Sequence, residues 1–206
     1  MTTTILSARN LSVRFGGVLA VNNVSFDVHE GEVFTLIGPN GAGKTTVFNL
    51  ISRIYEPTAG EIDYQGKKLT DQPAHAIAGL GIARTFQNIE LFEHATVLHN
   101  LLIGRHTHRK TGFLRDMFFT ATAREAELQA RLKAEEVIDL LHLQHYRDTM
   151  VAGLPYGVRK VVELARALCT EPRLLLLDEP SSGLNVEETD DMAFWIQDIQ
   201  QELGIT

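Results

Sequence analysis

Hydrophobic and polar positions alternate along the first thirty residues in the manner of β-strands. The alternation extends over residues 5–15, stops at a pair of glycines, and resumes over residues 18–28. An uninterrupted apolar run at residues 33–37 predicts a fully buried strand, and residues 61–66 predict a hairpin strand that ends in a turn. The amino-terminal part of the chain is therefore expected to be largely β-structure, with antiparallel pairing at its start.

In the rest of the chain, apolar residues recur at helical spacings of three and four. A helix is expected from about residue 44 to 53, and residues 96–143 are mostly helical, with an amphipathic helix at 122–141. The remaining elements are a helix, a second buried strand and a last helix, at residues 154–169, 173–177 and 186–203. Buried strands that alternate with helices indicate an α/β core, to which the antiparallel beginning and the helical middle are additions.

The composition fits a single globular domain. The 206 residues are 44% hydrophobic and 22% charged, which are ordinary values for such a fold. The net charge is −7, so general attraction to nucleic acid or anionic lipid is not favoured. One cysteine, Cys169, excludes an internal disulfide framework, and no apolar run approaches the ~20 residues of a membrane helix. Because no secretory signal is visible either, we expect a cytoplasmic protein.

One glycine-rich segment matches a phosphate-binding loop. Residues 38–45 read Gly-Pro-Asn-Gly-Ala-Gly-Lys-Thr and satisfy G-x-x-x-x-G-K-[ST] between a predicted buried strand and a predicted helix. In such a loop backbone N–H groups point at a polyphosphate, Lys44 can reach the β- and γ-phosphates, and the Thr45 hydroxyl can bind Mg²⁺. A chance match is the alternative. The residues expected to contact the nucleotide are Gly38, Pro39, Asn40, Gly41, Ala42, Gly43, Lys44, Thr45 and Thr46.

Two acidic residues follow the second buried strand. Asp178 and Glu179 come directly after four leucines, at the carboxyl end of the strand, where open α/β sheets bind their ligands. Asp178 can hold the metal through a water molecule, and Glu179 can orient or deprotonate the water that attacks the γ-phosphate. Two solvated acids at a strand end are the alternative. An adjacent Asp and Glu beside a phosphate loop favour a nucleotide hydrolase over a small-molecule kinase.

Further segments complete an ordered set of motifs. They are Gln87 after residues 82–86, the glycine-containing segment 154–158 that opens a helix, and Leu-Asp-Glu-Pro at 177–180. With the phosphate loop, this set resembles an ABC transporter ATPase subunit over essentially the whole chain. Within the family the chain is similar to the branch that energises import of branched-chain amino acids, usually as one of two different ATPase subunits. The segments that carry this similarity are residues 81–88, 91–92, 96–98, 105–125 and 154–157.

The resemblance implies an α/β fold with a P-loop NTPase core, an N-terminal antiparallel β subdomain and an inserted α-helical subdomain. The whole chain, 1–206, would be one ABC ATPase cassette. Residues 1–86 and 160–206 would form its β-rich and core parts, and residues 87–159 the helical subdomain. Family members carry a histidine in a further strand and loop that has no counterpart here. The resemblance therefore implies either a C-terminally incomplete cassette, which we favour, or a cassette that cannot hydrolyse ATP normally. The 206-residue chain is expected to bind nucleotide and to turn it over poorly.

The resemblance also implies roles for particular residues. Phe15 would stack on adenine, unless it is a core residue of its strand. Gln87 would contact Mg²⁺ and the attacking water, unless it is a surface glutamine. Glu179 and Gln87 would be the catalytic residues, and Thr45, Gln87 and Asp178 would serve the metal. The signature-like segment would close over the ATP held by a partner subunit, through Leu154, Tyr156, Gly157 and Val158.

The function implied is that of an ATP-binding and ATP-hydrolysing subunit of a membrane importer, with ATP and Mg²⁺ as cofactors. Its partners would be a second ABC ATPase subunit, identical or different, the transmembrane permease subunits and, indirectly, a solute-binding protein. It would lie at the inner face of the cell membrane. Residues 181–185 would join the two sites of the dimer, and residues 87–112 would receive the membrane subunit. A non-transport ABC ATPase in DNA maintenance or translation control is the alternative, but the chain has no sustained heptads.

The chain departs from the family pattern at the signature. The usual Leu-Ser-Gly-Gly-Gln is here Leu-Pro-Tyr-Gly-Val, so Pro155 offers neither a hydroxyl nor an N–H, and Val158 replaces an amide side chain. The remaining anion ligands are backbone N–H groups from Gly157 onward, at a helix N-terminus. We expect the ATP site completed by this segment to be weaker or slower than its counterpart. Asn185 stands where many relatives carry Asp.

Overall fold

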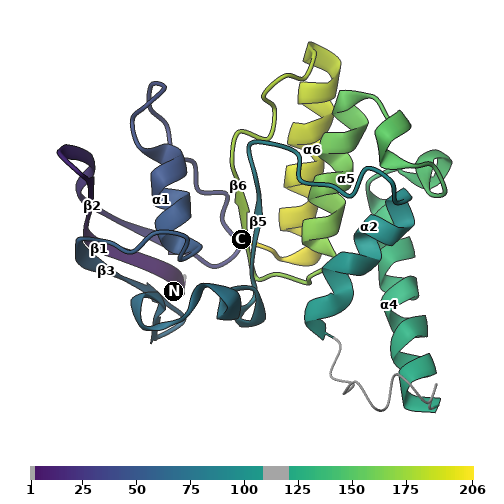
Figure 1. Ribbon diagram of the computed structural model, residues 1–206, viewed down its shortest axis with the longest axis horizontal. Coiled ribbons are helices and arrows are strands. Elements are labelled where there is room, and N and C mark those ends of the chain that lie inside the picture. The colour runs from purple at the N-terminus through teal and green to yellow at the C-terminus, as the bar shows by residue number, and fades with distance from the viewer. Residues whose placement is uncertain (1–2, 109–120) are drawn as a thin grey trace. The chain divides into compact units, whose positions relative to one another are not determined.

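The computed structural model describes residues 3–108 and 121–206 of the chain (Figure 1). The described residues form two compact units. The first unit contains the residues up to Arg84 together with residues 173–178 and 196–206. The second contains the residues from Thr85 to Pro172 and residues 179–195. The assignment of residues 87–159 to a helical subdomain stays a prediction.

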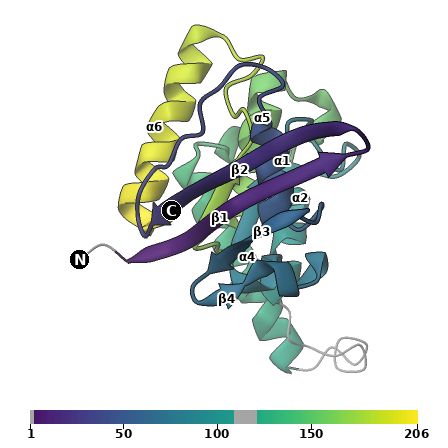
Figure 2. The same cartoon turned by 90° about the vertical axis from the view of Figure 1, so that its left-hand side faces the viewer.

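A four-stranded antiparallel sheet dominates the first unit. Its strands, in spatial order, are β2 (Val18–His29), β1 (Thr4–Phe15), β3 (Ala59–Tyr64) and β4 (Lys67–Lys68). Figure 2 shows the long β1–β2 pair with β3 beside β1. The strands predicted from the alternating pattern are therefore confirmed, and the turn after β3 lies at the predicted glycine, Gly66.

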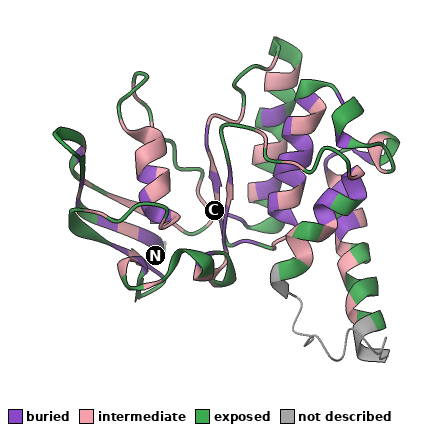
Figure 3. Ribbon diagram, viewed as in Figure 1, coloured by how far each residue is buried: buried purple, intermediate pink, exposed green. Residues whose placement is uncertain are grey.

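Helix α1 (Lys44–Ile51) shares a hydrophobic core with this sheet. It contributes the buried side chains of Val47, Leu50 and Ile51, and the helix predicted from about residue 44 is confirmed. The largest fully buried side chains of the sheet lie in the same core, and they are Leu6, Leu11, Val13, Ile62 and Tyr64. Figure 3 shows this buried side of the sheet and helix in purple. The core fixes where α1 begins, and so where the phosphate loop ends.

Strands β5 (Ile82–Thr85) and β6 (Leu174–Leu177) form a separate two-stranded sheet. β6 is the second strand predicted from the sequence, and it ends at Asp178. Leu174 and Leu176 are buried, whereas the two other leucines are only half-buried. β6 therefore has one buried face and one half-buried face.

The prediction of a fully buried strand at residues 33–37 is wrong. Val33 is 59% exposed and Ile37 is 93% exposed, and the segment is not a strand. A strand needs the N–H and C=O groups of a neighbour. Near its start β6 is bonded to β5 on one side. On the other side the Leu175 N–H donates to the Thr206 carbonyl, and the Thr206 N–H donates to the Arg173 carbonyl. Among the described residues no backbone hydrogen bond pairs 33–37 with a strand.

Helices build the second unit. They are α2 (Val97–Gly104), α4 (Ala121–Leu140), α5 (Tyr156–Leu168) and the first ten residues of α6 (Val186–Leu203). α2 packs against both α4 and α5, and each of the three helices has buried side chains, among them Leu101, Ile138 and Leu164. The predicted helices are confirmed within the described residues. Residues 109–120, which belong to the predicted helical stretch 96–143 and to the similar segment 105–125, lie outside the described residues. Cys169 follows α5 and is buried.

Short 3₁₀ turns join these elements, at Leu69–Asp71, Ala74–Ala76, Ala78–Leu80, Arg105–His108, Gln144–Tyr146 and Val151–Gly153. None of the helices in the described part of the chain is long and apolar enough to cross a membrane.

Candidate functional site

The glycines of the phosphate loop take backbone conformations that other residues avoid. Gly41 and Gly43 have φ angles of +82° and +88°. A Cβ atom on Gly43 would lie 2.6 Å from the carbonyl oxygen of Ala20 on β2. The loop thus approaches the strand as closely as only glycine permits. The motif is therefore a packing requirement of the first unit as well as a chemical pattern.

Lys44 is the first residue of α1, and its side chain turns back over the loop. Its Nζ donates hydrogen bonds to the carbonyl oxygens of Gly38 at 2.8 Å and Pro39 at 3.1 Å. No side chain in the described ranges caps this end of α1. An uncapped helix N-terminus beside an ammonium group is suited to bind an anion, because backbone N–H groups and the helix dipole both favour negative charge there.

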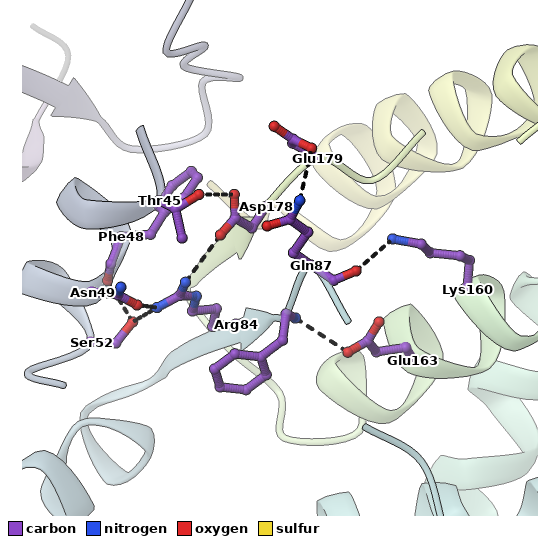
Figure 4. Close-up of polar contacts among 11 residues, drawn as sticks. Thr45, Phe48, Asn49, Ser52, Arg84, Gln87, Lys160, Glu163, Asp178 and Glu179 are labelled. Atoms are coloured by element: carbon purple, nitrogen blue, oxygen red, sulfur yellow. Dashed lines mark hydrogen bonds and ion pairs between the residues drawn. The ribbon is translucent and has the colours of Figure 1, made fainter. Parts of the chain in front are cut away.

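Thr45 and Asp178 meet where the phosphate-loop helix and β6 come together in the first unit (Figure 4). The Thr45 hydroxyl donates to Asp178 Oδ1 at 3.2 Å. Asp178 is only 2% exposed, and a buried carboxylate is stable only when hydrogen-bonded or paired. Two of the three residues that were predicted to serve the metal are thus neighbours, although 133 positions separate them in the chain.

This oxygen pair fits Mg²⁺ in its usual protein setting. Mg²⁺ prefers oxygen ligands and is commonly held by one or two protein groups together with water and substrate phosphates. Among the described residues there is no group of three His, Cys, Asp or Glu side chains that could hold a metal without such help. The donor set therefore suits a metal that arrives with a polyphosphate.

Gln87 and Glu179 lie close together in the second unit. The Gln87 side-chain amide donates to Glu179 Oε2 at 3.5 Å, a long hydrogen bond. Glu179 has a φ angle of +50°, a left-handed conformation that is uncommon for a residue with a side chain. Both predicted catalytic residues therefore lie next to each other, and Glu179 directly follows Asp178 in the chain.

Three charged side chains on one face of α5 hold the segment around Gln87. Lys160 Nζ donates to the Gln87 carbonyl at 3.4 Å, Glu163 Oε1 accepts the Phe86 N–H at 3.2 Å, and Arg166 donates to the Glu90 carbonyl. Burial raises the pKa of the Glu163 carboxyl above its usual value, against the opposing effects of the Phe86 N–H and the Lys160 charge. The Gln87 segment is thus fastened to the helix that the signature-like segment opens.

Phe15, the predicted adenine-stacking residue, ends β1 and is 42% exposed. Its ring meets the Tyr55 ring edge-on, with 4.9 Å between centroids. This exposure argues against the alternative that Phe15 is a core residue. In the loop itself, Asn40, Gly41 and Ala42 are exposed and Thr46 is half-buried.

The signature-like segment begins α5 in the second unit. Leu154 and Gly157 are buried, whereas Tyr156 is exposed and Val158 half-buried. The Tyr156 hydroxyl is 3.5 Å from the carbonyl oxygen of Ser182. A Cβ atom on Gly157 would collide with the Glu188 carboxylate. The segment and the loop at residues 181–185 are therefore in contact within this chain.

Comparison with known proteins supports the motif-based interpretation. The ABC transporter family profile matches residues 21–182, most of the chain. The chain belongs to the ABC transporter family.

Relatives in this family include proteins of one transport system. The chain is similar to the high-affinity branched-chain amino acid transport ATP-binding protein BraF of Pseudomonas aeruginosa, with 42% identity over all of this chain and 81% of that protein. It is 39% identical to the corresponding protein LivG of Escherichia coli over the same shares of the two chains. The crystal structure of the ADP conformation of an ATP-binding cassette from an ABC transporter has a TM-score of 0.84 and 32% identity, over 100% of this chain and 80% of that one. The resemblance and the expected cassette fold are confirmed.

The contacts of some residues of this ABC cassette were not predicted from the sequence. Arg84 contacts Asp178, and the residues around Arg84 in the sequence gave no indication of this contact. Asn185 caps α6, because its Oδ1 accepts the Glu188 N–H at 2.9 Å while Glu188 accepts the Asn185 N–H at 3.0 Å. That reciprocal pair is a capping box. Its Asn-x-x-Glu spacing at the start of a predicted helix was a usable signal.

Proposed function

We propose that this chain is an ATP-binding and ATP-hydrolysing subunit of a membrane importer for branched-chain amino acids. The observation that carries the proposal is the Thr45–Asp178 oxygen pair beside Lys44, the arrangement that an Mg²⁺-bound polyphosphate requires. The substrate class is supported by the names of BraF and LivG, to which the whole chain is similar. ATP hydrolysis is the activity that members of the ABC transporter family share.

The loop and its flanking residues would bind ATP. Backbone N–H groups of residues 38–46 and the Lys44 ammonium would hold the phosphates. The Phe15 ring, exposed at the end of β1, would stack on adenine. Thr45, Asp178 and Gln87 would serve Mg²⁺, which when bound neutralises charge on the β- and γ-phosphate oxygens.

Glu179 would act on the attacking water. A carboxylate can orient that water or accept its proton when it lies within hydrogen-bond reach. The Gln87 amide next to Glu179 would help to hold the same water, and the α5 contacts would keep Gln87 in place. Positioning and electrostatic stabilisation by these groups would supply most of the rate enhancement, as is general for phosphoryl transfer.

A second ABC ATPase subunit would complete the site. Leu154, Tyr156, Gly157 and Val158 would close over the partner's ATP, and the segment from Gln87 onward would meet the permease subunits at the inner face of the cell membrane. Because Pro155 lacks a hydroxyl and an N–H, the site completed by this segment would turn over more slowly than its counterpart. Single-turnover hydrolysis with a Glu→Gln change in one subunit at a time tests this, and equal rates would contradict it.

The experiment that tests the function has two parts. Titration of the purified chain with a fluorescent ATP analogue and Mg²⁺ should show binding that Lys44→Ala weakens by about tenfold or more, the value of a charge-assisted hydrogen bond. Lys67→Ala, which removes an exposed lysine of β4, is the matched control and should bind as the wild type does. Absence of Mg²⁺-ATP binding at millimolar concentration would overturn the proposal.

The transport role needs the assembled importer. The chain is coexpressed with the branched-chain amino acid permease subunits and their second ATPase subunit, and uptake of labelled leucine is measured in membrane vesicles. Uptake should depend on this chain and be lost in the Lys44→Ala assembly. Uptake that is unchanged when the chain is omitted would show that this chain does not energise the import of branched-chain amino acids.

A further inference from the structure

A buried arginine touches the proposed metal ligand from the side opposite Thr45. Arg84 lies on β5, and its side chain is 7% exposed. Its Nη2 donates to Asp178 Oδ2 at 3.1 Å, whereas the Thr45 hydroxyl bonds Oδ1. The two oxygens of one carboxylate are thus held by two partners from two different elements, as Figure 4 shows.

The same arginine is fastened to the phosphate-loop helix. Its Nη1 donates to Asn49 Oδ1 at 2.7 Å and to Ser52 Oγ at 3.3 Å, and its guanidinium carbon lies 5.8 Å from the centre of the Phe48 ring. Thr45 and Asn49 are four positions apart in α1, and Ser52 is three further on, so these polar residues line one face of the helix. Arg84 therefore joins that face to the end of β6.

These contacts depend on the forked shape of the guanidinium group. Its nitrogens point in fixed directions, so one side chain can bond a carboxylate and an amide at once, whereas a lysine ammonium cannot reproduce the fork. With Thr45 as its only partner, the Asp178 carboxylate could rotate about its last bond and move its oxygen away from the Thr45 hydroxyl. Arg84 removes that freedom.

We propose that Arg84 is a positioning residue for the Mg²⁺-nucleotide site, which holds the Asp178 carboxylate at the distance from Thr45 that a shared metal needs. The proposal rests on the function proposed above. Groups that orient metal ligands without touching the metal commonly contribute about 10–100-fold to metal affinity.

Charge alone predicts the opposite effect. A guanidinium near the metal repels it, so if Arg84 acted only through its charge, a neutral replacement would strengthen Mg²⁺ binding. If Arg84 positions Asp178, both a neutral replacement and a lysine replacement weaken it. The sign of the change therefore separates the two explanations.

The test measures how much Mg²⁺ adds to nucleotide affinity. A fluorescent ATP analogue is titrated into the full chain with excess EDTA and then with saturating Mg²⁺, for the wild type, Arg84→Met and Arg84→Lys. We expect affinity in EDTA to stay within about twofold of the wild type, because the phosphate loop is intact. The Mg²⁺-dependent gain should fall by about tenfold in both variants.

Two further variants separate positioning from stability. Arg53→Met removes another arginine of the first unit with a buried side chain, which bonds Gln72 and Glu56 but none of the site residues, and it should keep the full Mg²⁺ gain. Asn49→Ala leaves the Arg84–Asp178 pair in place but removes the shorter of the two hydrogen bonds at the other end of the guanidinium group, and it should lose part of the gain. Circular dichroism and urea unfolding confirm that each variant is folded.

The outcomes are distinguishable. A wild type that does not bind the analogue refutes the proposed function. A wild type with a clear Mg²⁺ gain, and folded Arg84 variants whose gain is unchanged or larger, refutes the positioning role alone. If Arg84→Met does not fold, the Arg84→Lys and Asn49→Ala variants decide the question by the same two titrations.

Discussion

Replacement of Gly43 by alanine tests whether the phosphate loop depends on its close approach to β2. The added Cβ would lie 2.6 Å from the Ala20 carbonyl oxygen and 3.2 Å from a methyl carbon of Val21. Even favourable contacts between carbon and a carbonyl oxygen keep about 3.3 Å. Because backbone atoms make the nearest contact, the loop or the strand must shift.

The chain contains a matched control for the size of this effect. Gly41 has a similar φ angle, +82°, but a Cβ there would meet nothing within 4 Å. Alanine at either position pays about 1–2 kcal/mol for a left-handed backbone, offset by about 0.4–1 kcal/mol from the less flexible unfolded chain. Only Gly43→Ala adds the overlap, which costs about 1–3 kcal/mol. The difference between the two variants isolates that cost.

The assay is urea unfolding followed by circular dichroism, with the free energy extrapolated to water, and titration with the fluorescent ATP analogue. Gly43→Ala should be less stable than Gly41→Ala by about 1–3 kcal/mol and should bind the analogue more weakly. If the two variants unfold with equal free energies and Gly43→Ala binds like the wild type, the loop does not depend on this contact.

Three further outcomes follow from single side chains. Because burial raises the pKa of Glu163 above its ordinary 4.5, the wild type should lose stability relative to Glu163→Gln as the pH rises from about 4.5 through that raised value, which thermal unfolding at about pH 5 and pH 7 measures; a pH-independent difference would contradict this. Burial raises the pKa of Cys169 to about 12, so iodoacetamide should label it only in denaturant, and rapid native labelling would refute its burial. Asn185→Ala should lose about 1 kcal/mol in urea unfolding by uncapping α6, with Asn185→Asp as the control that keeps the cap.

Much of the fold could be predicted because its elements are defined by local patterns. β1, β2 and α5 follow from apolar residues repeated at the strand or helix period. The segment at residues 33–37 shows the limit of prediction from local patterns. A run of apolar residues indicates a preference for burial, but a strand also needs a partner edge, and which edges are taken is decided by residues far away, here Leu175 and Thr206. No pattern within five residues contains that information.

The candidate site likewise has a part that the sequence predicts and a part that it does not. The phosphate loop could be predicted because its glycines and lysine keep a fixed spacing within eight residues. The Arg84 contacts could not, because Asn49 and Asp178 lie 35 and 94 positions away. Before the strands are placed, an arginine in an apolar strand is simply a polar residue with an unknown partner. Its burial gains meaning only when β5 brings it between α1 and the end of β6.

The start of α5 shows what the departure at the signature changes. Pro155 stands at the N-cap position with φ −55° and ψ 153°, and its carbonyl accepts the Arg159 N–H at 3.0 Å, so the helix begins normally. An N–H at this position precedes the helical hydrogen bonds, and its absence costs the helix nothing. What is absent is a hydroxyl that could cap the first turn. Since no side chain among the described residues caps α5, the first backbone N–H groups of the helix stay available for the proposed contact with a phosphate, and the ligand set lacks only the hydroxyl. This is why we expect a slower site and not an inactive one.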